Sequence, residues 1–218
     1  MKPVTNPSKR HQRIGPPDPE APPVVLASAS ASRRALLENA GVVATVDAAP
    51  VDEQEVKASL RAAGATAADV AEALAELKAQ RVSARHEGAL VIGADQVLEC
   101  EGEWFDKPRD LDHAAAHLQA LSGRTHRLVA CVCVVRDGRR LWHHVDSAEL
   151  TMRPLSERFV ADYLAAVGED ALASVGGYRL EGLGAQLFSR VAGDYFTVLG
   201  LPLLPLLDFL RNQRVVPT

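Results

Sequence analysis

Hydrophobic positions along the chain follow two different periods, which predicts an interleaved set of strands and helices. Continuous apolar runs, such as Val24-Val25-Leu26-Ala27 and Ala89-Leu90-Val91-Ile92-Gly93, are typical of buried strands. Apolar positions three or four residues apart, such as Val70, Leu74 and Leu77, are typical of one face of a helix. In the first half of the chain the pattern predicts strands at 24–27, 42–46 and 89–93, and helices at 33–40 and 66–87.

A long β-hairpin is the strongest local signal in the second half. Residues 126–136 alternate between apolar and other side chains, Asp137-Gly138 provides the turn, and a second strand follows at 139–152. The pattern also predicts helices at 110–121, 156–167 and 202–210, and further strands around Phe188, Val191, Tyr195 and Val198. Because helices and strands interleave while the hairpin is antiparallel, we expect an α/β fold with a mixed sheet flanked by helices.

The first 23 residues differ in composition from the rest. They hold seven of the 13 prolines, and basic and polar residues lie between them without the apolar core of a secretory signal. We therefore expect 1–23 to be a disordered or loosely packed leader, and 24–218 to be a single domain.

Composition and charge narrow the classes of function. The hydrophobic fraction of 47% argues against a disordered chain, and the longest apolar stretch, 197–210, is too short and interrupted to span a bilayer. A formal net charge of −4 gives no general basic field, so we expect no nucleic-acid partner. The three cysteines lack zinc-type spacing and favour free thiols, and hence a cytoplasmic location.

A strand that runs into a helix through small hydroxyl residues forms the first candidate site. In Leu26-Ala27-Ser28-Ala29-Ser30-Ala31-Ser32-Arg33-Arg34, hydroxyls, free backbone N–H groups and the positive end of a helix dipole come together. This combination favours an anion site; the alternative is a serine cap followed by two solvated arginines. The chain has no Gly-x-x-x-x-Gly-Lys-Ser/Thr loop, which excludes a P-loop nucleotidase.

Two acidic positions and two lysines are further candidates for chemistry. Glu53 lies in a predicted loop after Pro50, and Asp95 lies just past the end of the strand at 89–93, a frequent place for a carboxylate that binds Mg²⁺ or orients water. The alternative for Asp95 is a simple turn residue. Lys78 and Lys107 each carry a compact ammonium suited to a phosphate oxygen, or else lie on a solvated surface.

Eight short motifs occur in one order along the chain. They are Leu-Ala-Ser-x-Ser with Arg-Arg and Leu-Leu, Val-Asp-Glu, Glu76-Leu77-Lys78-Ala79, Gly93-Ala94-Asp95, Asp106-Lys107-Pro108, Leu121-Ser122-Gly123-Arg124-Thr125-His126, Glu-Gly-x-Gly, and Val-x-Gly-Leu-Pro-Leu. In this order they resemble the Maf family over about residues 24–212, nearly all of the chain after the leader.

The resemblance implies a nucleoside triphosphate pyrophosphatase. Such enzymes cleave between the α- and β-phosphates with a divalent metal, here expected to be Mg²⁺ with Mn²⁺ as the alternative. The implied fold is an elongated α/β structure related to the inosine-triphosphate pyrophosphatases, with two lobes around a cleft, and a homodimer is expected. The implied roles are phosphate binding by Ser28, Arg33, Lys78 and Lys107, metal binding by Glu53 and Asp95, and catalysis by Asp95.

The chain departs from the commonest pattern of the family at positions that bear on the base. Ala31-Ser32 replaces the usual Pro-Arg, Gln96 replaces a Thr after the aspartate, and Glu181 replaces a Gln. These changes resemble the subgroup that acts on 7-methyl-GTP, so Gln96 and Glu181 are candidates for base recognition. The alternatives are a pyrophosphatase that prefers dTTP or UTP, a housekeeping hydrolase with a flat substrate profile, and a non-catalytic nucleotide-binding regulator of cell division.

Overall fold

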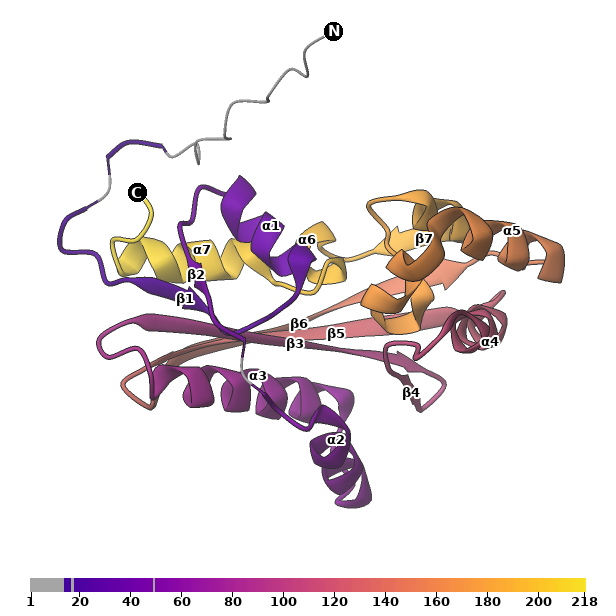
Figure 1. The fold of residues 1–218 in the computed structure, drawn as a ribbon, viewed down its shortest axis with the longest axis horizontal. Coiled ribbons are helices and arrows are strands. Elements are labelled where there is room, and N and C mark those ends of the chain that lie inside the picture. Colours follow the sequence, from indigo (N-terminus) through magenta and orange to yellow (C-terminus); the bar gives the residue numbers. More distant parts are fainter. Residues whose placement is uncertain (1–13, 17, 49) are drawn as a thin grey trace, which may run out of the picture.

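The protein folds around one mixed β-sheet. In this computed structural model, residues 14–16, 18–48 and 50–218 are described, and within them seven strands form a sheet of order β2-β1-β3-β5-β6-β7, with β4 paired to β3 (Figure 1). β1 pairs in parallel with β2 and β3, and the other pairs are antiparallel. The strands are β1 (Val24–Leu26), β2 (Thr45–Val46), β3 (Leu90–Cys100), β4 (Glu103–Phe105), β5 (Thr125–Arg136), β6 (Arg139–Met152) and β7 (Phe188–Ala192).

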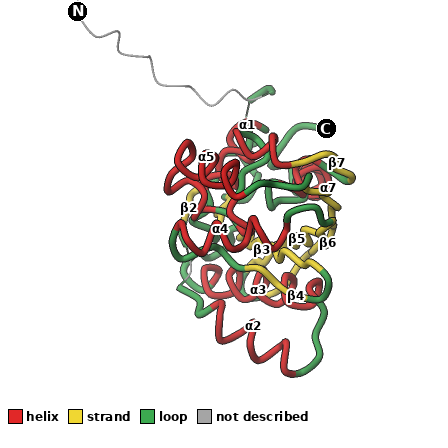
Figure 2. The backbone as a smooth tube through the Cα atoms, turned by 90° about the vertical axis from the view of Figure 1, so that its right-hand side faces the viewer, coloured by secondary structure: helices red, strands yellow, loops and turns green. Residues whose placement is uncertain are grey.

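Helices cover both faces of this sheet, as the view in Figure 2 shows. The α-helices are α1 (Ala31–Asn39), α2 (Glu53–Ala62), α3 (Ala67–Ser83), α4 (Leu111–Leu121), α5 (Glu157–Val167), α6 (Tyr195–Val198) and α7 (Leu203–Asn212), and the 3₁₀ segments are η1 (Gly168–Ala173), η2 (Val175–Gly177) and η3 (Leu183–Leu187). The predicted mixed α/β fold is confirmed. Among the helices of the described residues, none has the length and apolar character needed to cross a membrane.

The β5–β6 hairpin is the part of the sheet that sequence pattern predicts best. Asp137 and Gly138 have φ values of 50° and 75°, so both central residues of the turn are left-handed, as a two-residue hairpin turn requires. The strand pairing runs from Thr125–Thr151 to Arg136–Arg139. The turn chemistry and the alternating pattern therefore agree, and the prediction is confirmed.

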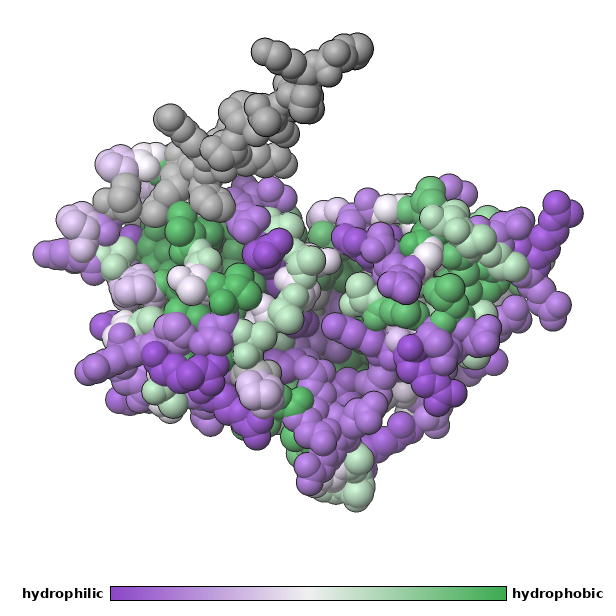
Figure 3. Space-filling view, in the orientation of Figure 1, coloured by the Kyte–Doolittle hydropathy of each residue, from purple (hydrophilic) through white to green (hydrophobic). Residues whose placement is uncertain are grey.

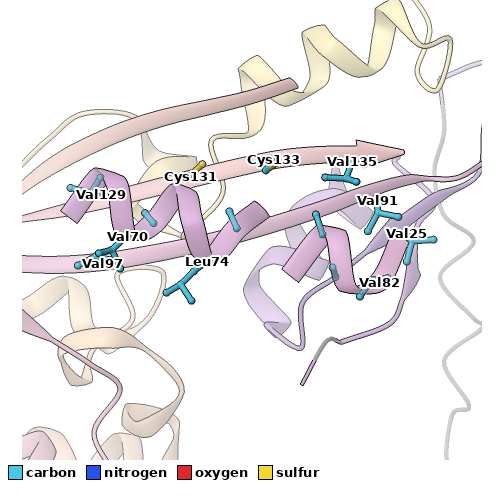
Figure 4. Close-up of a cluster of buried hydrophobic side chains, with 14 of the residues drawn as sticks. Val25, Val70, Leu74, Val82, Val91, Val97, Val129, Cys131, Cys133 and Val135 are labelled. Atoms are coloured by element: carbon cyan, nitrogen blue, oxygen red, sulfur yellow. The ribbon is translucent and has the colours of Figure 1, made fainter. Parts of the chain in front are cut away.

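Alternation along β3 divides the core between the two faces of the sheet. Val91 and Val97 pack against α3, together with Val129 of β5 (Figure 4). On the other face, Ile92 belongs to a cluster with α1 and α7, whereas Leu98 belongs to a separate cluster with α4 and α5. The two clusters on that face give the molecule two lobes, between which the surface is hollowed in Figure 3.

Gly93 lets α3 lie directly on β3. A Cβ at this position would lie 2.1 Å from the carbonyl oxygen of Ala75 and 2.9 Å from the Cβ of Ala79. Only glycine allows the helix backbone to approach this closely. The contact fixes the position of the next turn of α3, which carries Lys78.

Three sequence predictions are wrong in detail. Asp95 does not follow the strand end but lies in the middle of β3, because β5 pairs with β3 from Val91 to Glu99 and keeps it extended. Glu53 begins a helix rather than lying in a loop, since Asp52 caps α2 by accepting a bond from the backbone N–H of Glu55. Tyr195–Val198 is helical and not a strand, because Asp194 caps α6.

The predicted leader, 1–23, falls partly outside the described residues. Within the described part, Glu20 forms an ion pair with Arg214 near the C-terminus at 2.7 Å, and the carbonyl of Pro23 accepts a hydrogen bond from Leu90. The division into a leader and one domain stays a prediction.

His126 makes the stability of the fold depend on pH. It is 2% exposed in β5, its Nε2 lies 2.6 Å from the Tyr178 hydroxyl, and burial lowers its pKa from 6.5 to about 4. The unfolded chain therefore binds a proton that the folded protein excludes between these values. Above pH 6.5 we expect His126 to have no effect on how the free energy of unfolding changes with pH. As the pH falls from 6.5 towards 4, we expect His126 to lower this free energy by about 2 to 3 kcal/mol.

Urea unfolding of the wild type and of His126→Gln at pH 7.5 and pH 4.5 tests this expectation. The free energy of unfolding should fall less for the variant than for the wild type between the two pH values. Equal falls in both proteins would show that His126 does not carry this dependence.

Candidate active site

The edge of β3 is interrupted where the hollow lies. β1 pairs with residues 90–92 of β3, and β4 pairs with residues 98–100 on the same side. Within the described residues, 93–97 have no strand partner on that side. A cavity of about 530 Å³ opens there, and all of the predicted site residues line it: Ser28, Arg33, Glu53, Lys78, Asp95, Gln96, Lys107 and Glu181.

A buried lysine joins two carboxylates in the wall of this cavity. The ammonium of Lys78 lies 2.6 Å from Oδ1 of Asp95 and 2.7 Å from Oε1 of Glu53. Asp95 is 4% exposed and Lys78 7% exposed, so these two charges are largely withdrawn from water, whereas the side chain of Glu53 is 43% exposed. Burial by itself would raise the pKa of Glu53, but the charge and hydrogen bond of Lys78 outweigh it, and the pKa lies below its ordinary value.

One carboxylate oxygen of this cluster has no hydrogen-bond partner within the described residues. Oδ2 of Asp95 is buried and has no hydrogen-bond partner among the described residues. An unpartnered buried carboxylate oxygen is costly and calls for a ligand. Asp95 can therefore accept a proton or bind a cation at Oδ2 without losing its contact to Lys78.

The start of α1 holds a guanidinium against the interrupted edge of β3. Ser30 caps the helix by accepting a bond from the backbone N–H of Arg33. The Arg33 side chain donates to Oγ of Ser28 at 3.2 Å, to the carbonyl of Ala94 at 2.8 Å and to the carbonyl of Gly200 at 2.8 Å. The Ala94 carbonyl belongs to the part of the β3 edge that has no strand partner within the described residues, and Arg33 satisfies it in place of a strand. These contacts hold the positive charge of Arg33 at the cavity.

Two more lysines bring positive charge to the same wall. Burial, together with the positive charge of Arg33, lowers the pKa of Lys107. Lys57 is the residue that sequence reasoning missed: it lines the cavity from α2 and pairs with Asp106 at 2.5 Å. Burial alone would lower the pKa of Lys57, but the hydrogen bond to Asp106 and nearby carboxylates outweigh it, so the pKa is raised. Glu53 and Lys57 are four residues apart, so they lie on one face of a helix. Had the helix at 53–62 been predicted, this spacing would have indicated that Lys57 lies near Glu53.

The two candidates for base recognition lie beside α6 and α1. Gln96 donates from Nε2 to the carbonyls of Thr197 and Val198 at 2.9 and 3.2 Å, which ties α6 to β3. Oε1 of Glu181 accepts from the Arg179 guanidinium at 3.0 Å and from the Ser32 hydroxyl at 3.4 Å. The Ser32–Glu181 contact links the two lobes across the cavity.

The donor set fits a divalent cation that arrives with a phosphate-bearing ligand. The described residues include no cluster of three or more His, Cys, Asp or Glu side chains arranged for a metal. Glu53 and Asp95 nevertheless converge on the same ammonium, and Oδ2 of Asp95 is unpartnered within the described part of the chain. Mg²⁺ is commonly held by one or two carboxylates with phosphate oxygens and waters completing the shell, which is what these two residues offer.

Comparison with known proteins decides the family. A family model described as Maf-like protein matches residues 23–213. The chain belongs to the Maf family. A nucleoside triphosphate pyrophosphatase of Paramagnetospirillum magneticum is 59% identical over 88% of this chain and 100% of that protein. A 7-methyl-GTP pyrophosphatase of Rhizobium etli is 55% identical over 89% of this chain and 98% of that protein.

A solved structure is similar at a much lower level. The nucleoside-triphosphatase, a dITP/XTP pyrophosphatase, of Mycobacterium abscessus is 18% identical over 61% of this chain and 74% of that chain, with a TM-score of 0.38. The family model confirms the predicted membership of the Maf family. The two relatives named above are both pyrophosphatases, which confirms the prediction of an enzyme of the hydrolase class. The individual roles of the site residues stay predictions.

Proposed function

We propose that this Maf protein hydrolyses nucleoside triphosphates between the α- and β-phosphates, releasing a nucleoside monophosphate and pyrophosphate. The observation that carries the proposal is the buried carboxylate of Asp95, with an oxygen unpartnered among the described residues, in a cavity lined by Arg33, Lys78 and Lys107. A triphosphate is strongly anionic, and cations held in place around a cavity, of which Lys78 is buried, stabilise it more than freely solvated ones. The name of the relative from Paramagnetospirillum magneticum, a nucleoside triphosphate pyrophosphatase, supports the same reaction class.

A divalent cation, Mg²⁺ or alternatively Mn²⁺, is the cofactor that we propose. Glu53 and Asp95 would hold it, since both carboxylates contact the Lys78 ammonium and therefore lie next to each other in the cavity wall. When bound, such a cation offsets charge on the phosphate oxygens. Lys78 keeps the two carboxylates together in the protein without ligand, because its ammonium lies between them.

The residues of the chain account for the proton and the charge in the proposed reaction. A water oxygen bonds to the α-phosphorus, the bond from that phosphorus to the bridging oxygen breaks, and pyrophosphate leaves with the electron pair. Asp95 accepts the proton of the water at Oδ2, the oxygen that Lys78 does not contact. Arg33 and Lys107 offset charge that develops on the phosphate oxygens.

We also propose that Gln96 and Glu181 select a modified or non-standard nucleotide such as 7-methyl-GTP. A carboxylate can accept from both N1–H and N2–H₂ of guanine and favours the cationic methylated ring. The bonds from Arg179 and Ser32 go to Oε1 of Glu181, which leaves Oε2 for a base. The Nε2 group of Gln96 is engaged by α6, so its oxygen is the atom for a base donor.

Pyrophosphate release with Mg²⁺ from a panel of 7-methyl-GTP, GTP, dTTP, UTP and CTP tests the proposal. We expect 7-methyl-GTP to give the highest kcat/KM. A preference for dTTP or UTP would keep the reaction and overturn the proposed base, and a flat profile would indicate a housekeeping hydrolase. Binding of nucleotides without any turnover would favour a non-catalytic regulator.

Glu181→Gln tests the proposed base recognition directly. We expect the ratio of kcat/KM for 7-methyl-GTP over UTP to fall about tenfold, because the amide loses the charge-assisted contact to the methylated base. Ser32→Ala is the matched control, since it removes the hydroxyl that donates to Glu181 and leaves the carboxylate in place. An unchanged order of substrates in Glu181→Gln would rule out this role.

Several expectations lie beyond these tests. A homodimer, a cytoplasmic location and the absence of a nucleic-acid partner stay predictions from the sequence and its resemblance.

A further inference from the structure

The cavity connects the two faces of the sheet through the uncovered edge of β3. Asp95 and Gln96 are neighbours in an extended strand, so their side chains leave on opposite faces. Asp95 contacts Lys78 of α3, whereas Gln96 contacts the backbone of α6. Both line the same cavity, so a ligand in it can touch the acidic cluster on one face and the base-recognition candidates on the other.

Lys57 lies on the face with the acidic cluster. It comes one turn after Glu53 on α2, and α2 packs against α3. Its side chain is 14% exposed, while its partner Asp106 is half exposed. Both residues line the cavity, and Asp106 directly precedes Lys107.

A second ion pair on the same helix provides a comparison for the Lys57 pair. Arg61, one turn further along α2, pairs with Glu103 of β4 at 2.7 Å. Its side chain is far more exposed than that of Lys57, and neither partner lines the cavity. Both pairs connect α2 to neighbouring segments, but of the two only the Lys57 pair places an ammonium in the cavity wall, on a side chain that is 14% exposed. The position of Lys57 in the cavity wall therefore points to a ligand.

We propose that Lys57 is a further phosphate-binding residue, which exchanges Asp106 for the terminal phosphates of the substrate and binds the pyrophosphate product. The inference rests on the proposed function. With the base near Gln96 and Glu181 and the α-phosphate near Asp95, the phosphate chain extends towards the α2 side of the cavity. Lys57 carries an ammonium there, and a phosphate oxygen competes with Asp106 for it.

Inorganic pyrophosphate is the probe for this subsite. Its inhibition constant with Mg²⁺ is measured by release of nucleoside monophosphate, and its binding is measured by calorimetry without substrate. For Lys57→Gln we expect the inhibition constant and the dissociation constant of pyrophosphate to rise about tenfold, because one charge-assisted hydrogen bond is lost. For Asp106→Asn we expect both constants to fall about threefold, because the neutral asparagine competes less well than Asp106 with the phosphate for the Lys57 ammonium. Lys57→Arg should recover most of the binding, and inhibition by nucleoside monophosphate should stay unchanged.

Arg61→Gln is the matched control, because it breaks the outer ion pair of α2 and leaves the cavity wall intact. Equal weakening in Lys57→Gln and Arg61→Gln would mean that Lys57 acts only by placing α2, and would overturn the inference. Unchanged pyrophosphate binding in Lys57→Gln, or weaker binding in Asp106→Asn, would overturn it as well. Failure of the proposed function is seen separately, as absence of pyrophosphate release by the wild type.

Discussion

Asp95→Asn is expected to lower kcat for pyrophosphate release by about 10³-fold. The amide keeps the volume of the carboxylate but can neither accept the proton of the attacking water nor hold a cation well, and loss of a general base costs about 10² to 10⁴ in rate. The affinity for nucleotide should change much less, because Arg33 and Lys107 remain in the cavity. Steady-state and single-turnover assays with 7-methyl-GTP or the best substrate of the panel measure both quantities.

Asp110→Asn is the matched control for this change. Asp110 caps α4 by accepting from the backbone N–H of His113, and asparagine caps a helix about equally well. It does not line the cavity, so kcat should stay within about twofold of the wild type. If Asp95→Asn, folded as judged by its melting temperature, also kept kcat within about threefold, Asp95 would not be the general base.

Gly93→Ala is expected to be the most destabilising small change in the sheet. The added Cβ would lie 2.1 Å from the carbonyl oxygen of Ala75, which is helix backbone and cannot move without displacing α3. Overpacking of this kind costs about 3 kcal/mol or more, which lowers the melting temperature by roughly 6 to 12 °C in a chain of this length. Because the displaced helix carries Lys78, we also expect lower activity at temperatures where the variant is folded.

Gly182→Ala is the control for adding a methyl group. A Cβ at Gly182 would meet only the carbonyl oxygen of Arg179, at 3.9 Å, which is ordinary contact. Its melting temperature should stay within about 2 °C of the wild type. A similarly small shift in Gly93→Ala would show that α3 does not lie against β3 as described.

The local elements follow from sequence where a cap or turn agrees with the hydrophobic period. Thr66, Asp110 and Ser156 each accept a bond from a backbone N–H in the first turn of the helix that they precede. The prediction failed where the periodic signal was short. The capping role of Asp52 and of Asp194 can be read only once the following residues are known to be helical.

The site could be predicted as a set of residues but not as an arrangement. The ordered motifs named Ser28, Arg33, Asp95 and their companions through resemblance to the Maf family, and the structure brings all of them to one cavity. It could not be foreseen that Asp95 lies within a strand, since that depends on where β1 stops pairing and where β4 begins. Lys57 was missed for the same reason, because its relevance depends on how α2 packs on α3.

By itself the sequence determined the mixed α/β class, the hairpin and most helix ends, because these depend on periodicity, capping and turn chemistry over a few neighbouring positions. The candidate site residues came from the order of the motifs and their resemblance to the Maf family. Only the tertiary structure decided the gap in pairing along β3, the face on which each side chain leaves it, and the partner of each charge. Those features come from contacts between segments far apart in the chain, such as Arg33 with Ala94 and Gly200, or Lys57 with Asp106. Local patterns carry no information about such distances, whereas packing of the completed sheet and helices fixes them.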